Sequence, residues 1–125
     1  MKPLLTILML GNAALFLFGA LQHAGVVIGS FSEPIIIPAS IVETLCALAL
    51  TWGAVAVWGG SPRAWRAALI GNAIAIGGVA IGMVALAKGA GPRTASNDLY
   101  HGIMLALAAG SLVSLFVRRV RTAER

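Results

Sequence analysis

The amino-acid sequence predicts an all-α integral membrane protein that folds as a bundle of four membrane-spanning helices. Hydrophobic residues make up 59% of the 125-residue chain and charged residues only 10%, whereas a typical soluble domain has about 25% charged residues. The apolar residues also form four long runs, and about 20 apolar residues are enough to cross the hydrocarbon core of a bilayer. Most of the chain is therefore expected to face lipid or other helices.

Four helices are predicted, over residues 4–28, 39–58, 64–87 and 97–117. The breaks between them carry turn residues, in Ser32-Glu33-Pro34, Gly59-Gly60-Ser61-Pro62 and Gly89-Ala90-Gly91-Pro92. Lipid admits only helices and closed barrels, and the period-two alternation of barrel strands is missing. We therefore expect a single transmembrane domain over residues 1–125, with its helices connected up and down.

Lysine and arginine predict how the chain is oriented in the bilayer. With both termini in the cytoplasm, seven of the nine basic residues lie inside, and only Lys88 and Arg93 lie outside. The positive-inside rule then favours an N-in, C-in topology in a bacterial-type cytoplasmic (inner) membrane. The net charge of +5 does not indicate nucleic-acid binding, because no basic patch is interleaved with aromatic residues.

Small residues recur along one face of the third predicted helix, at alternating steps of three and four residues. They include Gly71, Ala75, Gly78 and Gly82, while Gly25 and Gly29 form a further GxxxG pair in the first predicted helix. Small residues let helix backbones approach closely in lipid. The pattern predicts helix packing, either within the bundle or against a second copy or another membrane subunit.

Ionisable residues within the predicted spans indicate a site near the outer ends of the helices. His23 lies toward the end of the first helix, Glu43 one turn into the second, and His101 at the start of the fourth, beside Asn97 and Asp98. An ionisable residue inside a span indicates a functional site by default. We predict that these five residues form a ligand, proton or metal site. The alternative is hydrogen bonding between helices, with Asp98 capping the fourth helix.

The first outer loop, residues 30–38, is too apolar for a loop exposed to water, and it contains two prolines. We expect it to lie at the interface or to re-enter the bilayer as a lid, with Glu33 near its tip as a sixth candidate site residue. Gly19 shares a helix face with His23, so we expect it to leave room beside the imidazole.

More than one cofactor is compatible with these residue types. Two histidines and a carboxylate can ligate zinc or iron, and two histidines can also bind haem axially. The short ligand spacings of dedicated metal motifs are missing. The single cysteine, Cys46, excludes an intramolecular disulfide and a CxxC redox pair.

Two stretches in the first half of the chain resemble DoxX-like membrane proteins. They are Gly19-Ala20-Leu21-Gln22-His23-Ala24-Gly25 and, after Pro38, Val42-Glu43-Thr44-Leu45-Cys46-Ala47-Leu48. The resemblance implies a small four-helix membrane protein with a histidine at the end of helix one and a glutamate early in helix two. Some members of that family are quinone-linked subunits of sulfur-oxidising enzymes, and most have no known role, so the resemblance is compatible with a quinone-linked role here.

Three classes of function are compatible with these features. The first is an accessory or structural subunit of a larger membrane complex, which the small-residue face favours. The second is a quinone-linked or other small-ligand redox module that uses the outer His/Glu cluster. The third is a small oligomeric transporter. An independent enzyme is not expected, because no nucleophile arrangement, phosphate-binding loop or catalytic carboxylate pair is found.

Overall fold

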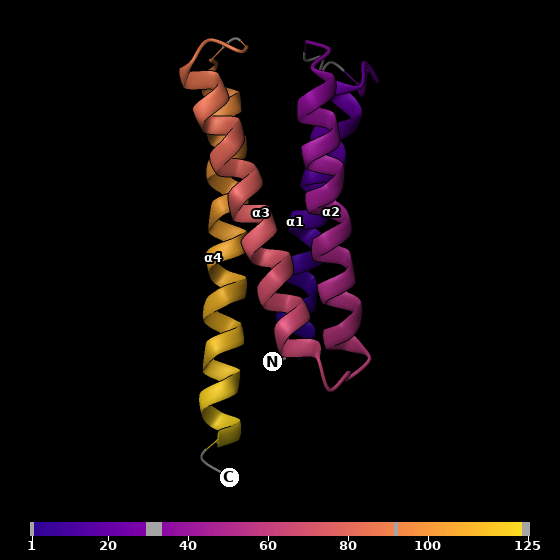
Figure 1. Cartoon of the computed structure of the whole chain (residues 1–125), viewed down its shortest axis with the longest axis vertical. Coiled ribbons are helices and arrows are strands. Elements are labelled where there is room, and N and C mark those ends of the chain that lie inside the picture. The colour runs from indigo at the N-terminus through magenta and orange to yellow at the C-terminus, as the bar shows by residue number, and fades with distance from the viewer. Residues whose placement is uncertain (1, 30–33, 92, 124–125) are drawn as a thin grey trace.

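The computed structural model describes residues 2–29, 34–91 and 93–123, which form four long α-helices (Figure 1). They are α1 (Lys2–His23), α2 (Ile37–Trp58), α3 (Ala64–Ala87) and α4 (Ala95–Ala123). Each contains a stretch of at least 22 residues that is apolar enough to cross a membrane. Such a stretch measures about 33 Å, against about 30 Å for the hydrocarbon core. The predicted all-α architecture is confirmed, and all four helices are candidate membrane spans.

The four helices lie alongside one another, as Figure 1 shows. The α1–α2 and α3–α4 connections lie at one end, which we call the two-loop end, and the α2–α3 connection and both termini lie at the other. Helix α1 packs on α2 and α4, and α3 likewise packs on α2 and α4. The helices therefore surround a common core.

Large apolar side chains cover the outside of the bundle. Ile7, Leu48, Ile81 and Val113, one from each helix, are all at least 60% exposed. Large apolar side chains exposed on every helix are unusual for a soluble monomer, whereas lipid tails accommodate them. The exposed surface, together with the four long apolar helices, indicates a multi-pass membrane protein.

Glycines bring α2 and α3 into close contact. A Cβ atom added to Gly71 would lie 2.7 Å from the backbone oxygen of Ala49, and one added to Gly78 would collide with the Sγ atom of Cys46. Ala75, between them on α3, is almost completely buried. The small face predicted on the third helix is thus used, at least over this stretch, for packing within the chain.

Helix α1 ends at His23, five residues before its predicted end. Gly25 N donates to Gln22 O and Val26 N donates to Leu21 O, both at 2.9 Å. With Gly25 at a φ of +93°, these are the bonds of a Schellman motif, which terminates a helix. The predicted GxxxG packing of Gly25 and Gly29 is therefore wrong, because both glycines lie beyond the helix.

The other helices differ less from the prediction. The bounds of α3 agree with the predicted range, and α2 begins two residues early, with Pro38 in its first turn. Proline suits a first turn because the amide that it lacks would have no partner there. Helix α4 extends past the predicted range at both ends.

Candidate functional site

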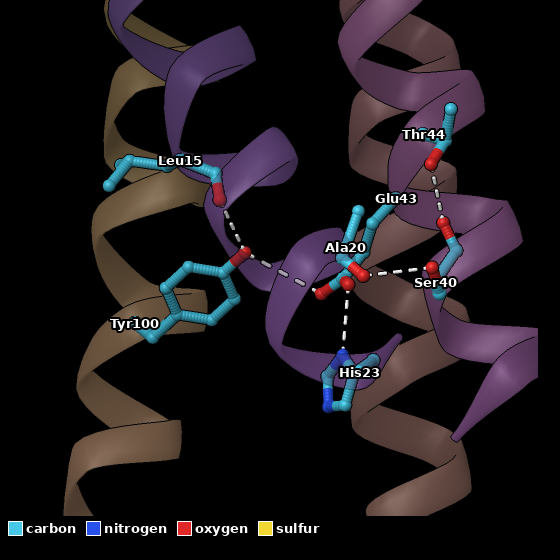
Figure 2. Close-up of polar contacts among 7 residues, drawn as sticks. All are labelled: Leu15, Ala20, His23, Ser40, Glu43, Thr44 and Tyr100. Carbon is cyan, nitrogen blue, oxygen red and sulfur yellow. Dashed lines mark hydrogen bonds and ion pairs between the residues drawn. The ribbon is translucent and has the colours of Figure 1, made fainter. Parts of the chain in front are cut away.

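His23 and Glu43 form the centre of the candidate site at the two-loop end (Figure 2). Nδ1 of His23 lies 2.9 Å from Oε2 of Glu43, and the two side chains are only 15% and 10% exposed. An ionised carboxylate only accepts hydrogen bonds, so Nδ1 is then the donor. The contact joins α1 to α2 where an unpaired charge would cost at least about 2.5 kcal/mol on insertion scales.

Backbone contacts around this pair hold the end of α1 against the start of α2. The Ser40 hydroxyl donates to Ala20 O at 2.8 Å, and Ile36 N donates to His23 O at 2.9 Å. The first contact is drawn in Figure 2. The carbonyl group of His23 and its ring thus both connect the end of α1 to the segment that begins α2.

Tyr100 reaches the same cluster from α4. Its hydroxyl donates to Leu15 O at 2.8 Å and lies 3.5 Å from Oε1 of Glu43 (Figure 2). The hydroxyl has one proton for two acceptor oxygens, and we assign it to Leu15 O because that contact is shorter by 0.7 Å (2.8 against 3.5 Å) and 3.5 Å is beyond the usual O–H···O range. No sequence pattern singles out Tyr100, since a tyrosine near a helix end is typical of the membrane interface.

Gly19 provides the space for these contacts. A Cβ atom added there would collide with the Tyr100 hydroxyl and would lie 2.6 Å from Oε1 of Glu43. We expected Gly19 to leave room for the imidazole of His23. The structure corrects this, because the phenol and the carboxylate take that space instead.

A partly enclosed cavity of about 260 Å³, which we call the His101 cavity, lies beside the pair. Residues from all four helices line it, including His23, Glu43, Asn97 and His101. Most of the remaining wall is apolar, with Phe16, Val42, Val79, Leu86 and Met104 among its residues. An apolar cavity of about 150 Å³ accepts benzene, so this volume suits a small ring or the end of a longer amphiphile.

His101 has its two ring nitrogens in different environments. Nδ1 lies 2.9 Å from the carbonyl oxygen of Asn97, so Nδ1 carries a proton and Nε2 of the neutral ring is an acceptor. No hydrogen-bond partner for Nε2 occurs in the described part of the chain. A Cβ atom added to Gly82 would lie 3.0 Å from Nε2, so this glycine leaves room beside the nitrogen.

A second cavity, of about 310 Å³, is lined by residues of α1 and α4, with Ser96 and Asn97 of α4 among them. Gly19, Gln22 and Tyr100 line it, and His23 and Asn97 line both cavities. Gln22 is 7% exposed, and its Nε2 has no hydrogen-bond partner among the described residues. The site is therefore more polar on the α1–α4 side than in the His101 cavity.

Two of the predicted site residues are not placed in this cluster. The carboxylate of Asp98 pairs with Arg93 at 3.2 Å, and both side chains are exposed. Asp98 does not cap α4 either, because Thr94 Oγ1 accepts the hydrogen bond from Asn97 N at 3.2 Å. Glu33 lies outside the described residues.

The described part of the apolar loop borders the His101 cavity. Pro34 and Ile36 line the cavity. Ile36 also approaches the α3–α4 connection, where a Cβ atom added to Gly91 would lie 3.4 Å from its Cδ1. Pro34 and Ile36 thus lie beside the candidate site, whereas residues 30–33 are outside the described part, so the lid stays a prediction.

Within the described residues, no group of three or more His, Cys, Asp or Glu side chains is arranged to hold a metal ion. What the geometry offers is a histidine–carboxylate pair and a second histidine at the wall of a mainly apolar cavity. Comparison with protein-family models, curated proteins and solved structures finds no match for this chain.

Proposed function

We propose that this multi-pass membrane protein binds a small amphiphilic molecule in the His101 cavity. One observation supports the proposal: His23, Glu43 and His101, from three different helices, line a single cavity whose wall is otherwise mostly apolar. Ligand sites typically combine an apolar wall with a few convergent polar groups. A purely structural cluster would need no such space beside it.

We further propose an up-and-down arrangement with both termini in the cytoplasm of a bacterial-type inner membrane. The distribution of lysine and arginine along the chain supports it, since seven of nine lie near the termini or the α2–α3 connection. In this orientation the two-loop end, and with it the ligand site, belongs to the outer leaflet.

A relationship to DoxX-like proteins is part of the proposal, and it would make a quinone one candidate ligand. The contact between His23 and Glu43 supports it, because these are the two residues that carry the resemblance. A metal ion receives less support, since the described residues contain no group of three metal ligands.

A second candidate function is that of an accessory subunit in a homo-oligomer or a larger membrane complex. Gly11, Gly77 and Gly102 favour it, because a Cβ atom added to any of them would meet nothing within 4 Å in the described structure. Glycines on a lipid-facing surface let a helix of another chain approach closely. Such an assembly is compatible with a ligand site inside the bundle.

Two neighbouring substitutions on α3 test the ligand site. Ala85 lines the His101 cavity, whereas the adjacent Val84 lines neither cavity and is 54% exposed. Ala85→Phe should fill the cavity, and Val84→Phe should place the same ring in lipid. Small molecules extracted from each purified protein are compared by mass spectrometry, together with a visible spectrum and metal analysis.

We expect a compound that co-purifies with the wild type and Val84→Phe but is lost from Ala85→Phe. Equal extracts and spectra from all three proteins would contradict a resident ligand in this cavity. Co-purification of another protein with all three variants would instead favour the accessory-subunit function.

A further inference from the structure

Two of the residues that line the His101 cavity, His101 and Glu43, each offer an acceptor atom. Nε2 of His101 accepts in the neutral ring, because Nδ1 donates to Asn97 O. On Glu43, Oε2 already receives the His23 hydrogen bond at 2.9 Å, whereas Oε1 has the Tyr100 hydroxyl at 3.5 Å. That hydroxyl has its shorter contact, 2.8 Å, with Leu15 O. A ligand that donates hydrogen bonds therefore matches both acceptors.

The charge of the residues that line the cavity also favours a ligand that donates hydrogen bonds, and in particular a cation. Glu43 is the one carboxylate among the described residues that line either cavity, and no lysine or arginine lines them. An ionised carboxylate inside a membrane span is costly unless it is paired. His23 offsets this charge when it is protonated, and a cationic ligand would offset it when His23 is neutral.

From these two observations we propose that the cavity selects a lipophilic primary amine, bound as its ammonium ion. The inference rests on the proposed ligand site and names the chemical class of the ligand. The ammonium group has three N–H donors, enough to supply one for each of the two acceptors, Oε1 of Glu43 and Nε2 of His101. The apolar body of the ligand lies along the part of the wall formed by Val79, Leu86 and Met104.

Other head groups match the same atoms less well. An alcohol has one proton and cannot donate to both acceptors. A carboxylic acid adds a second carboxyl group beside Glu43, and two carboxylates at one site cannot both ionise readily. A quaternary ammonium carries the charge but has no N–H group.

The experiment uses the full chain in phosphatidylcholine nanodiscs and four fluorescent probes with one apolar body. They are 1-naphthylmethylamine, 1-naphthalenemethanol, 1-naphthoic acid and (1-naphthylmethyl)trimethylammonium, and empty nanodiscs give the lipid background. We expect the primary amine to bind about tenfold to a hundredfold more tightly than each of the others, as hydrogen bonds to charged groups predict.

Two variants of His101 identify the acceptor. The amide of asparagine can replace Nδ1 and keep the bond to Asn97 O, but it leaves nothing at Nε2, whereas the glutamine amide reaches the Nε2 position. His101→Asn should therefore weaken amine binding about tenfold or more, and His101→Gln should weaken it less. Thermal unfolding of each variant shows whether the bundle is intact, and Val84→Phe is the control with unchanged binding.

The possible results separate this inference from the function on which it rests. Equal binding of the alcohol, the acid or the quaternary probe, still abolished by Ala85→Phe, would overturn the amine selectivity and leave the ligand site standing. Binding of the amine that neither His101→Asn nor Glu43→Gln weakens would also overturn it. No binding by any probe, or binding that Ala85→Phe leaves unchanged, would overturn both the inference and the proposed site.

Discussion

The carboxylate of Glu43 lies against the backbone of Gly19 and occupies the space that a side chain at position 19 would need. A Cβ atom added to Gly19 would lie only 2.6 Å from Oε1 and 3.0 Å from the carboxyl carbon. Because the Tyr100 hydroxyl occupies the same space, this one glycine lets α1, α2 and α4 meet at the candidate site.

Gly19→Ala should therefore destabilise the protein by about 1–3 kcal/mol, as overpacking of a filled interior typically does. The added methyl group must displace either the carboxylate of Glu43 or the hydroxyl of Tyr100. The measurement is the free energy of unfolding in mixed micelles titrated with sodium dodecyl sulfate.

Gly11→Ala is the matched control, because a Cβ atom at this position on the same helix meets nothing within 4 Å in the described structure. Alanine has the higher helix propensity, by up to about 1 kcal/mol, so this variant should be neutral or slightly more stable. Equal stability of the two variants would mean that Gly19 does not make the contact described.

Tyr100→Phe removes the hydroxyl and leaves Leu15 O without its inter-helix donor. We expect a loss of about 0.6 kcal/mol, the average for inter-helix hydrogen bonds in a membrane protein, and at most about 1.7 kcal/mol. The proton belongs to the bond with Leu15 O at 2.8 Å, and the contact with Glu43 is 3.5 Å. Tyr100→Phe should therefore cost about the same in the wild type and in Glu43→Gln.

The comparison is a double-mutant cycle in the same unfolding assay. Independent effects add to within about 0.5 kcal/mol. A coupling energy well above that value would show that the hydroxyl donates to Glu43, and the assignment of its proton to Leu15 O would be wrong.

The proximity of His23, Glu43 and His101 could be predicted from the sequence, but the contacts of the site could not. Helical rise and the basic residues predict that His23, Glu43 and His101 lie at one level, and all three line one cavity. Which side chains touch depends on how the helices rotate against one another. The contact of the Tyr100 hydroxyl with Leu15 O and the space that Gly19 leaves for it therefore follow only from the packing of α4 on α1.

Gly25 shows a different limit of sequence reasoning. A glycine four residues from another glycine suits close helix packing, and a glycine at the end of a helix suits a turn with positive φ. The sequence is compatible with both, and only the hydrogen bonds of Gly25 N and Val26 N show that α1 ends in a turn at this glycine. By contrast, Gly78 lies in the interior of α3, where the packing interpretation agrees with its contact with Cys46.

Two adjacent glycines on α3 allow a test of that packing. Gly78→Leu would push the new side chain against Cys46, whereas a Cβ atom at Gly77 meets nothing within 4 Å in the described structure. We expect Gly78→Leu to lower the yield of folded protein in gel filtration and to cost more stability than Leu86→Ala. Gly77→Leu should extract and elute like the wild type.

Gly82→Leu should behave like Gly78→Leu, because its side chain would meet Nε2 of His101. If both leucine variants fold like the wild type, the description of the small-residue face is wrong. A Gly77→Leu variant that folds but loses a higher oligomeric state would instead place a second chain at the lipid-facing side of α3.

The proposed topology predicts opposite labelling of the two ends of the bundle. Ser61 belongs to the α2–α3 connection and Ala90 to the α3–α4 connection, and Figure 1 places these connections at opposite ends. With both termini in the cytoplasm, Ala90→Cys in intact cells should react with a membrane-impermeant maleimide, and Ser61→Cys should react only after the membrane is opened. The wild type is a suitable blank, because Cys46 is 1% exposed.

The reverse pattern would place both termini outside and the His23–Glu43 pair in the inner leaflet, against the distribution of lysine and arginine. Labelling of both variants from the same side would contradict the spanning of the membrane by α3, since that helix alone connects the two positions.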